Sequence, residues 1–411
     1  MRNRASTPKH RLRRSLSKGQ CRLTRQCRLT RQCRLTGQCR LTGHGRSKRQ
    51  YRAQEQRRRP DRRRWLAHVF AVSVLFAPLT AVAVVHGDRS SQLSDRDSAS
   101  EYWDIVAHFD SNHHLFARFL ITNEGPGDRT AIATWQLIDP NGKRTEFRNG
   151  RRKKRWTLSP DGNRIEIGSS IFDQSGSVHR LEYDSTKRGI RVAFEYSPSG
   201  PVGWPDSAAD RYPFDLLELG TPVTGTVWLE GMSEAVSVSG TITITHTWME
   251  ESEVDLALRR IEFSSTGSGP SIYLSDRTAP SGERERWLFI ARDGEVLVQT
   301  TDFELDLVDP PNQNRGDYPT WSELKISGPT FEGAIQYGST LAEADPLEAI
   351  PQPFQFLLSF KLRPHRVWAR ASFEIRLLAG QDTLKTVLKG SGVSTITFTN
   401  PLPPKATPPG I

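Results

Sequence analysis

The chain has 411 residues, enough for two domains, and its formal net charge of +11 invites a nucleic-acid-binding interpretation. The charge is unevenly placed: residues 1–64 hold 23 Lys and Arg but 2 Asp and Glu, which leaves the rest of the chain with 34 basic and 44 acidic residues. Because a body with a net charge of −10 repels phosphate backbones on average, we expect no nucleic-acid partner.

Residues 20–43 repeat a six-residue unit four times, as QCRLTR, QCRLTR, QCRLTG and QCRLTG, and contain all four cysteines. One leucine per unit and a strong positive charge cannot build a core, so we interpret residues 1–64 as a disordered basic leader or as a repeat translated upstream of the true start. The alternative is a thiol-bearing tail that binds metal or acidic polymers. Equal cysteine spacing without histidine is a poor zinc signature, which favours the first interpretation.

An export signal is predicted over residues 65–87. Three arginines, Arg62–Arg64, precede an apolar run that ends near Ala81-Val82-Ala83, which has the small-x-small form of a signal-peptidase site. The segment DRRRWL at residues 61–66 also has the form of a twin-arginine signal. The alternative is an uncleaved transmembrane anchor, since the run is about the ~20 residues that a spanning helix needs. Both interpretations predict a periplasmic or cell-envelope protein.

From residue 98 onward the pattern is repeatedly that of β-strands. Alternating apolar residues predict strands over 103–109, 115–121, 131–137, 192–196 and 367–377, and Asp293-Gly294 predicts a hairpin between 287–292 and 296–300. Only 251–261 suggests a short helix, and it could equally be a strand. Many short strands joined by turns predict an all-β fold of antiparallel barrels or sandwiches. We expect two such domains, over 98–250 and 251–402.

The most regular predicted strand is Val236 to Trp248, VSVSGTITITHTW. Its even positions are Val, Gly, Ile, His or Trp and its odd positions are all Ser or Thr, so the strand has one dry face and one hydroxyl-bearing face. His246 and Trp248 lie on the dry face. His246 is therefore a candidate functional residue, and the alternative is a core histidine satisfied by a neighbouring carbonyl.

Two segments resemble a known family. The stretch Pro222 to Ser265 (PVTGTVWLEGMSEAVSVSGTITITHTWMEESEVDLALRRIEFSS) and the aromatic strand Tyr102–Phe109 (YWDIVAHF) are similar to the tandem lipocalin-like proteins that include survival factors and hydroxyneurosporene synthase, a carotenoid 1,2-hydratase. The resemblance implies two antiparallel lipocalin-like barrels in tandem, with interior space for an apolar ligand. It also implies that His246 matches the histidine that ends the corresponding strand of the family.

Signatures of other reaction classes are missing from the sequence. There is no Gly-x-Ser-x-Gly elbow, no phosphate-binding glycine loop and no His-Glu-x-x-His, and we expect no cofactor. Asp139-Pro140-Asn141-Gly142 predicts a plain turn rather than a calcium loop. His108, Asp110, His113 and His114 form a polar hairpin loop in which a metal site is the alternative, and we expect no metal.

These observations favour an exported protein that binds an apolar or amphipathic small molecule, such as a lipid or isoprenoid. The expected binding residues point into the first barrel: His246, Trp248, Trp103, Phe109 and Trp135. One alternative is a hydratase or isomerase acting on a polyene or terpenoid, with His246 and Glu250 handling protons. The other is a structural protein of the cell envelope.

Two further segments have surface roles in this hypothesis. The run RNGRRKKR at 148–155 is a basic island in an acidic body, and its residues Arg151, Arg152, Lys153, Lys154 and Arg155 are candidates for contact with an anionic membrane surface. The alternative is a solvated hairpin tip. The Pro- and Gly-rich segment 198–213 is either a lid or a plain crossover.

Overall fold

The computed structural model describes residues 89–124, 129–199, 213–308, 318–349, 363–379 and 384–400. The predicted leader, the predicted export signal and most of segment 198–213 lie outside these residues. Within them, no helix has both the length and the apolarity that crossing a membrane requires. Both sheets described below belong to one compact unit, Pro78–Ile411.

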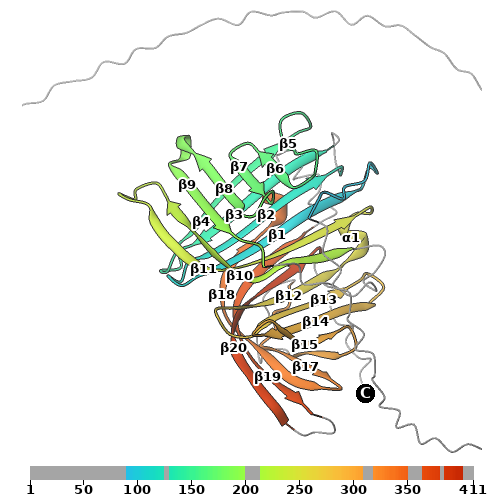
Figure 1. Ribbon diagram of the computed structural model, residues 1–411. Helices are drawn as coiled ribbons and strands as arrows, with labels where there is room; N and C mark the ends of the chain where they lie inside the picture. Colours follow the sequence, from blue (N-terminus) through green and yellow to red (C-terminus); the bar gives the residue numbers. More distant parts are fainter. Residues whose placement is uncertain are drawn as a thin grey trace, which may run out of the picture. The chain divides into compact units, whose positions relative to one another are not determined.

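The first sheet is antiparallel and curls into a half-barrel (Figure 1). Its order is β4-β3-β2-β1-β11-β10-β9-β8-β7-β6-β5. The strands are β1 Ser100–Phe109, β2 His114–Thr122, β3 Thr130–Ile138, β4 Arg144–Arg151, β5 Thr157–Leu158, β6 Arg164–Ile167, β7 Ser170–Asp173, β8 His179–Ser185, β9 Ile190–Tyr196, β10 Phe214–Trp228 and β11 Val236–Met249. A 3-10 turn, η1 Thr186–Arg188, joins β8 to β9.

The second sheet repeats this architecture after the short helix α1, Glu253–Leu256. Its order is β15-β14-β13-β12-β20-β19-β18-β17-β16. The strands are β12 Arg259–Thr266, β13 Ser271–Thr278, β14 Arg284–Arg292, β15 Glu295–Thr300, β16 Glu304–Val308, β17 Glu323–Gly328, β18 Phe331–Ala344, β19 His365–Leu378 and β20 Leu384–Phe398, with a 3-10 turn, η2 Pro346–Ala349. The predicted all-β fold of two antiparallel lipocalin-like sheets is confirmed.

The predicted strands lie where the alternation placed them. The segment 236–248 is β11, and 367–377 lies within β19. Asp293 and Gly294 both have positive φ between β14 and β15, which is the backbone that an Asp-Gly hairpin turn requires. The ambiguous segment 251–261 divides into helix α1 and the start of β12.

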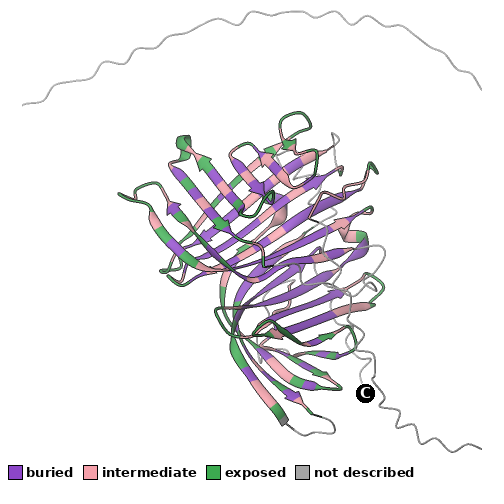
Figure 2. Cartoon of the chain, in the orientation of Figure 1, coloured by how far each residue is buried: buried purple, intermediate pink, exposed green. Residues whose placement is uncertain are grey.

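Each sheet encloses its own apolar core, seen as the buried inner faces in Figure 2. In the first sheet the core contains aromatic rings that contact one another. The ring centroids of Trp135 and Phe147 are 5.6 Å apart in a stacked pair, and those of Phe119 and Phe172 are 5.5 Å apart. Gly240 of β11 passes close to β1, since a Cβ there would lie 2.0 Å from the carbonyl oxygen of His108. The interior of this half-barrel is thus lined by buried aromatic and aliphatic side chains.

The outer faces of the two sheets also contact each other. Phe116 of β2 stacks on Trp368 of β19, with ring centroids 4.9 Å apart. A second contact joins Phe214 of β10 to Trp287 of β14 at 5.7 Å. These contacts explain why both faces of β11 are buried near its end: Thr243, Thr245 and Thr247, on its hydroxyl-bearing face, are at most 6% exposed. That face meets the second sheet rather than solvent.

Candidate functional site

A cavity of about 1680 Å³ lies between the two sheets. Residues of both sheets line it, and on β1, β2, β3 and β11 all of them except the core residues Ile105 and Ala117 belong to the outer face, opposite the aromatic core. Its apolar wall includes Val106, Phe116, Leu120, Ile132, Met249, Trp368 and Val393. Its polar wall includes Tyr102, Asp104, Arg118, Thr134, Gln136, Thr245, Glu262, Tyr273, Arg366, Thr395 and Thr397.

The polar wall is built from two rows of paired residues. Across the first sheet the register aligns Thr245, Asp104, Arg118, Thr134 and Arg148 on β11, β1, β2, β3 and β4. Across the second sheet it aligns Arg260, Thr397 and Arg366 on β12, β20 and β19. Directly opposed residues on neighbouring strands share a face of the sheet, so each row presents its side chains together.

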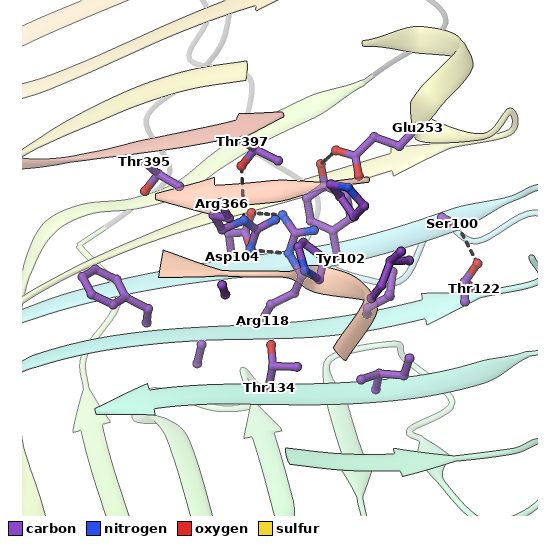
Figure 3. Close-up of a pocket in the computed structure, with 18 of the residues that line it drawn as sticks. Ser100, Tyr102, Asp104, Arg118, Thr122, Thr134, Glu253, Arg366, Thr395 and Thr397 are labelled. Carbon is purple, nitrogen blue, oxygen red and sulfur yellow. Dashed lines mark hydrogen bonds and ion pairs between the residues drawn. The ribbon is translucent and has the colours of Figure 1, made fainter. Parts of the chain in front are cut away.

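Asp104 lies at the centre of this wall and joins the two sheets (Figure 3). Its carboxylate accepts two hydrogen bonds from Arg118 of its own sheet, one of them from Nε at 2.5 Å. From the second sheet, Nη2 of Arg260 donates to Oδ2 at 2.9 Å and Nη1 of Arg366 approaches Oδ1 at 3.5 Å. One carboxylate therefore faces three guanidinium groups.

The electrostatics of this group follow from its burial. Burial alone would raise the pKa of Asp104, but the charges of Arg118 and Arg366 outweigh it and hold that pKa well below its ordinary value. Asp104 is thus ionised at neutral pH. Burial lowers the pKa of Arg366 to about 10, and the neighbouring charge of Arg118 acts in the same direction. The cluster holds more positive charge than one carboxylate balances.

Two tyrosine hydroxyls extend the polar wall. Tyr102 Oη donates to Oε1 of Glu253 at 3.0 Å and accepts a hydrogen bond from Arg260. Tyr273 Oη donates to Oε1 of Glu262 at 2.7 Å. Burial raises the pKa of Tyr102 to about 12, although the charge of Arg260 opposes the rise, so this phenol remains protonated. The two phenols therefore act as hydrogen-bond donors to carboxylates at the cavity wall.

Two buried polar atoms at the cavity have no hydrogen-bond partner among the described residues: Oγ1 of Thr245 and Oε1 of Gln136. An unsatisfied buried acceptor or hydroxyl costs about 1–3 kcal/mol. Both atoms are buried within the cavity wall, where neither faces the open space.

His246 lies on the other side of the first sheet, in the core. It is fully buried, its ring stacks on Trp103 at 4.5 Å, and Nε2 is 2.7 Å from Oε1 of Glu101. Glu101 is also fully buried and accepts hydrogen bonds from the Ser91 hydroxyl and the Gln92 amide. His246 is not among the described residues that line the large cavity.

The other predicted site residues separate into two groups. Trp103, Phe109 and Trp135 are fully buried in the aromatic core of the first sheet and, among described residues, do not line the large cavity. Trp248 and Glu250 line a smaller cavity of about 510 Å³ near the end of β11. Glu250 lies 2.8 Å from Arg96 in an exposed ion pair, and the carboxylate that contacts His246 is Glu101.

The histidine cluster lies beside the contact between the sheets. Nδ1 of His108 and Nδ1 of His114 are 3.2 Å apart. Burial, together with the charges of His108 and Arg370, lowers the pKa of His114 to about 3. No group of three or more His, Cys, Asp or Glu suited to a metal ion occurs among the described residues.

Most residues of the polar wall were missed in the sequence interpretation, including Asp104, Arg118 and Arg366, and so was Arg260, which contacts Asp104. Each lies on the strand face that alternation assigns to solvent. The sequence signal for this cluster was weak, because it consisted only of opposite charges on the outer faces of strands that pair. The basic run was better placed, since Arg148, Arg151, Arg152, Lys153 and Arg155 all line the cavity, while Lys154 is not among its lining residues.

Neither a scan of family models nor a search of curated proteins gave a match. Solved structures do match the fold. A candidate AttH from Nitrosomonas europaea superposes with a TM-score of 0.53 at 15% identity, over 74% of this chain and 94% of that one.

CghA bound to Sch210972 matches with a TM-score of 0.53 at 10% identity, over 78% of this chain and 99% of that one. Kievitone hydratase from Nectria haematococca matches with a TM-score of 0.51 at 11% identity, over 78% of this chain and 95% of that one. At these identities the likeness establishes the tandem lipocalin-like fold, and activity must be argued from the site.

Proposed function

We propose that this protein binds an apolar or amphipathic small molecule in the cavity between its two sheets. The observation that carries the proposal is the cavity itself, whose apolar wall surrounds a few convergent polar groups. The structure of CghA with Sch210972 is consistent with a small-molecule site in this fold.

Two experiments test this proposal. An organic extract of the purified protein, analysed by mass spectrometry, should contain an apolar compound in repeated preparations. Thr134→Trp, which places an indole in the cavity, should weaken binding of the neutral fluorescent probe N-phenyl-1-naphthylamine. Thr157→Trp on the exposed face of β5 is the matched control and should bind the probe normally. Equal binding by both variants would rule out this cavity as the site.

A second candidate function is the addition of water to a carbon–carbon double bond. The favouring observation is a group of carboxyls at one end of the cavity: Glu124, Glu253 and Asp255. Desolvation and the charges of Glu253 and Asp255 raise the pKa of Glu124, against a hydrogen bond from Ser252 that lowers it, which favours the protonated acid. Kievitone hydratase, with the same fold, is a hydratase by name.

The reaction would proceed by general acid–base catalysis. A carboxylic acid donates a proton to one alkene carbon, water adds to the other carbon, and the water returns a proton to the carboxylate. Glu124, whose pKa is raised, is the candidate donor, and Glu253, which accepts the hydrogen bond of Tyr102, is a carboxylate whose charge raises that pKa. Glu124→Gln should abolish hydration of a bound polyene while leaving its affinity largely unchanged. The predicted alternative instead makes His246→Ala the inactive variant.

Export and membrane contact are further parts of the proposal. Export depends on residues 62–87, which lie outside the described part of the chain. Membrane contact is supported by the position of the basic run, because Arg151, Arg152, Lys153 and Arg155 border the cavity. Anionic lipid headgroups at that border would place the cavity next to a source of apolar molecules.

A further inference from the structure

Arg366 of β19 has few partners for a buried cation. Its side chain is 8% exposed and lines the cavity. Nε donates to Oγ1 of Thr397 at 3.2 Å, and Nη1 is 3.5 Å from Oδ1 of Asp104, which is long for a hydrogen bond. Among the described residues, no carboxylate approaches it more closely.

The neighbouring carboxylates are held by other donors and leave Arg366 without a close contact. Asp104 is already engaged by two donors of Arg118 and by Arg260 at 2.9 Å. The second carboxylate of the cluster, Glu262, is 3.0 Å from Nε of Arg260 and accepts the hydroxyl of Tyr273. Three little-exposed guanidinium groups therefore face two little-exposed carboxylates and the half-buried Glu253, whose charge also acts on Arg366, and Arg366 is the guanidinium with the weakest contacts. A buried charge that lacks a close partner is costly, unless a further anion completes the site.

The geometry points to an anionic oxygen group on the ligand, a carboxylate or a phosphate, bound by Arg366 in the cavity. This inference rests on the proposed binding function. A guanidinium presents paired N–H donors that match either group. The lowered pKa of Arg366 agrees with this assignment, because an additional negative charge would relieve the effect of its burial and of Arg118.

The apolar wall beside Arg366 suits the rest of such a ligand. Trp368, two residues along the same strand, stacks on Phe116 of the first sheet, and Val393 belongs to the same apolar cluster. All three line the cavity. A long-chain acid could thus place its head at Arg366 and its chain against these side chains. The ligand class is an amphipathic acid rather than a neutral hydrocarbon.

The test compares three chain-matched amphiphiles: palmitic acid, hexadecyl phosphate and hexadecanol. Each amphiphile is titrated against bound N-phenyl-1-naphthylamine, and the concentration that displaces the probe is measured. The proteins are the wild type, Arg366→Met, Arg366→Lys and the control Arg376→Met. Arg376 lies on the same strand but is 53% exposed and pairs with Glu332 on the surface. The two acidic arms separate a carboxylate preference from a phosphate preference.

We expect at least one acid to displace the probe from wild type at about 10-fold lower concentration than the alcohol, as a charged hydrogen-bonded contact implies. Arg366→Met should reduce this preference to within about 2-fold and leave hexadecanol binding unchanged, and Arg376→Met should keep it. Because the contact is buried, the preference should persist at roughly 0.5 M salt, where surface charges are screened.

Equal displacement by acid and alcohol in wild type would overturn the inference, as would an unchanged preference in Arg366→Met. If Arg366→Met fails to fold, the comparison of acid with alcohol in the wild-type protein still tests the inference. Arg366→Lys tests it as well, because this variant should lose part of the preference for the acid. If neither the probe nor hexadecanol binds to any folded variant, the proposed binding function itself fails. Binding without an acid preference refutes only the role of Arg366.

Discussion

The role of Asp104 as the link between the two sheets makes a quantitative prediction about stability. Replacing it by Asn removes one negative charge from contact with three guanidinium groups while keeping the side-chain shape. Removing one partner of a buried ion pair costs about 3–5 kcal/mol, because the remaining charge is left uncompensated. We expect Asp104→Asn to lower the free energy of unfolding by about 3 kcal/mol or more.

Urea unfolding followed by tryptophan fluorescence measures this loss. The matched control is Asp184→Asn, which breaks an exposed pair with Arg191 in the same sheet, whose two side chains are 55% and 62% exposed. Exposed pairs contribute less than about 1 kcal/mol, so the control should unfold almost as wild type does.

A second substitution tests the charge imbalance directly. Arg366→Met in the Asp104→Asn background should restore part of the lost stability, because it removes one of the unbalanced guanidinium groups. The reasoning is refuted if Asp104→Asn costs no more than Asp184→Asn. It is also refuted if removing Arg366 makes the Asp104→Asn protein still less stable.

Three more predictions concern pH, packing and the basic run. The pKa of His114 is about 3 in the folded protein and 6.5 in its ordinary state. Between these two pH values the unfolded chain binds more protons than the folded one. The free energy of unfolding should therefore fall as the pH drops below 6.5, by up to about 1.4 kcal/mol per pH unit. His114→Phe should flatten this slope in urea unfolding. Gly240→Ala should cost about 1–3 kcal/mol, because its Cβ would meet the His108 carbonyl. Substituting Ser for the basic residues of 151–155 should weaken sedimentation with anionic vesicles by about 1 kcal/mol per residue.

Each of these has its own control and contrary outcome. A slope that His114→Phe leaves unchanged would show that other groups cause the acid sensitivity. Gly150→Ala, where a new Cβ would meet nothing within 4 Å, is the control for Gly240→Ala, and equal stability of the two variants would contradict the close approach. Neutral vesicles are the control for the basic run. If the wild-type protein sediments equally with neutral and anionic vesicles, the proposed membrane contact has no electrostatic basis.

The strands of this fold could be predicted because alternation is a local property of the chain. The segment 236–248 forms β11 as its period-two pattern requires, and Asp293-Gly294 turns where a hairpin turn was expected. Turn chemistry and side-chain periodicity both act within a few residues. The strands and turns could therefore be predicted from local sequence alone.

The site depended on pairings that local patterns do not contain. Alternation identifies two faces of a strand but not what covers the second face, so the faces that carry Thr245 and Asp104 could meet either solvent or the other domain. They became cavity residues because a second sheet packs there, which brings Arg366 within 3.5 Å of Asp104 across 262 positions of sequence. The same limit applies to His246, whose carboxylate neighbour Glu101 comes from β1, 145 residues earlier.

The central claim is that the ligand site lies between the sheets and not inside either half-barrel. Photolabelling with a diazirine derivative of hexadecanol, followed by peptide mass spectrometry, locates it directly. We predict labels on β2, β19 and β20, on the segments that carry Phe116, Trp368 and Val393, and we expect excess unlabelled hexadecanol to suppress them. Suppressible labels confined to core residues of the first sheet, such as Trp135 or Phe172, would contradict the account.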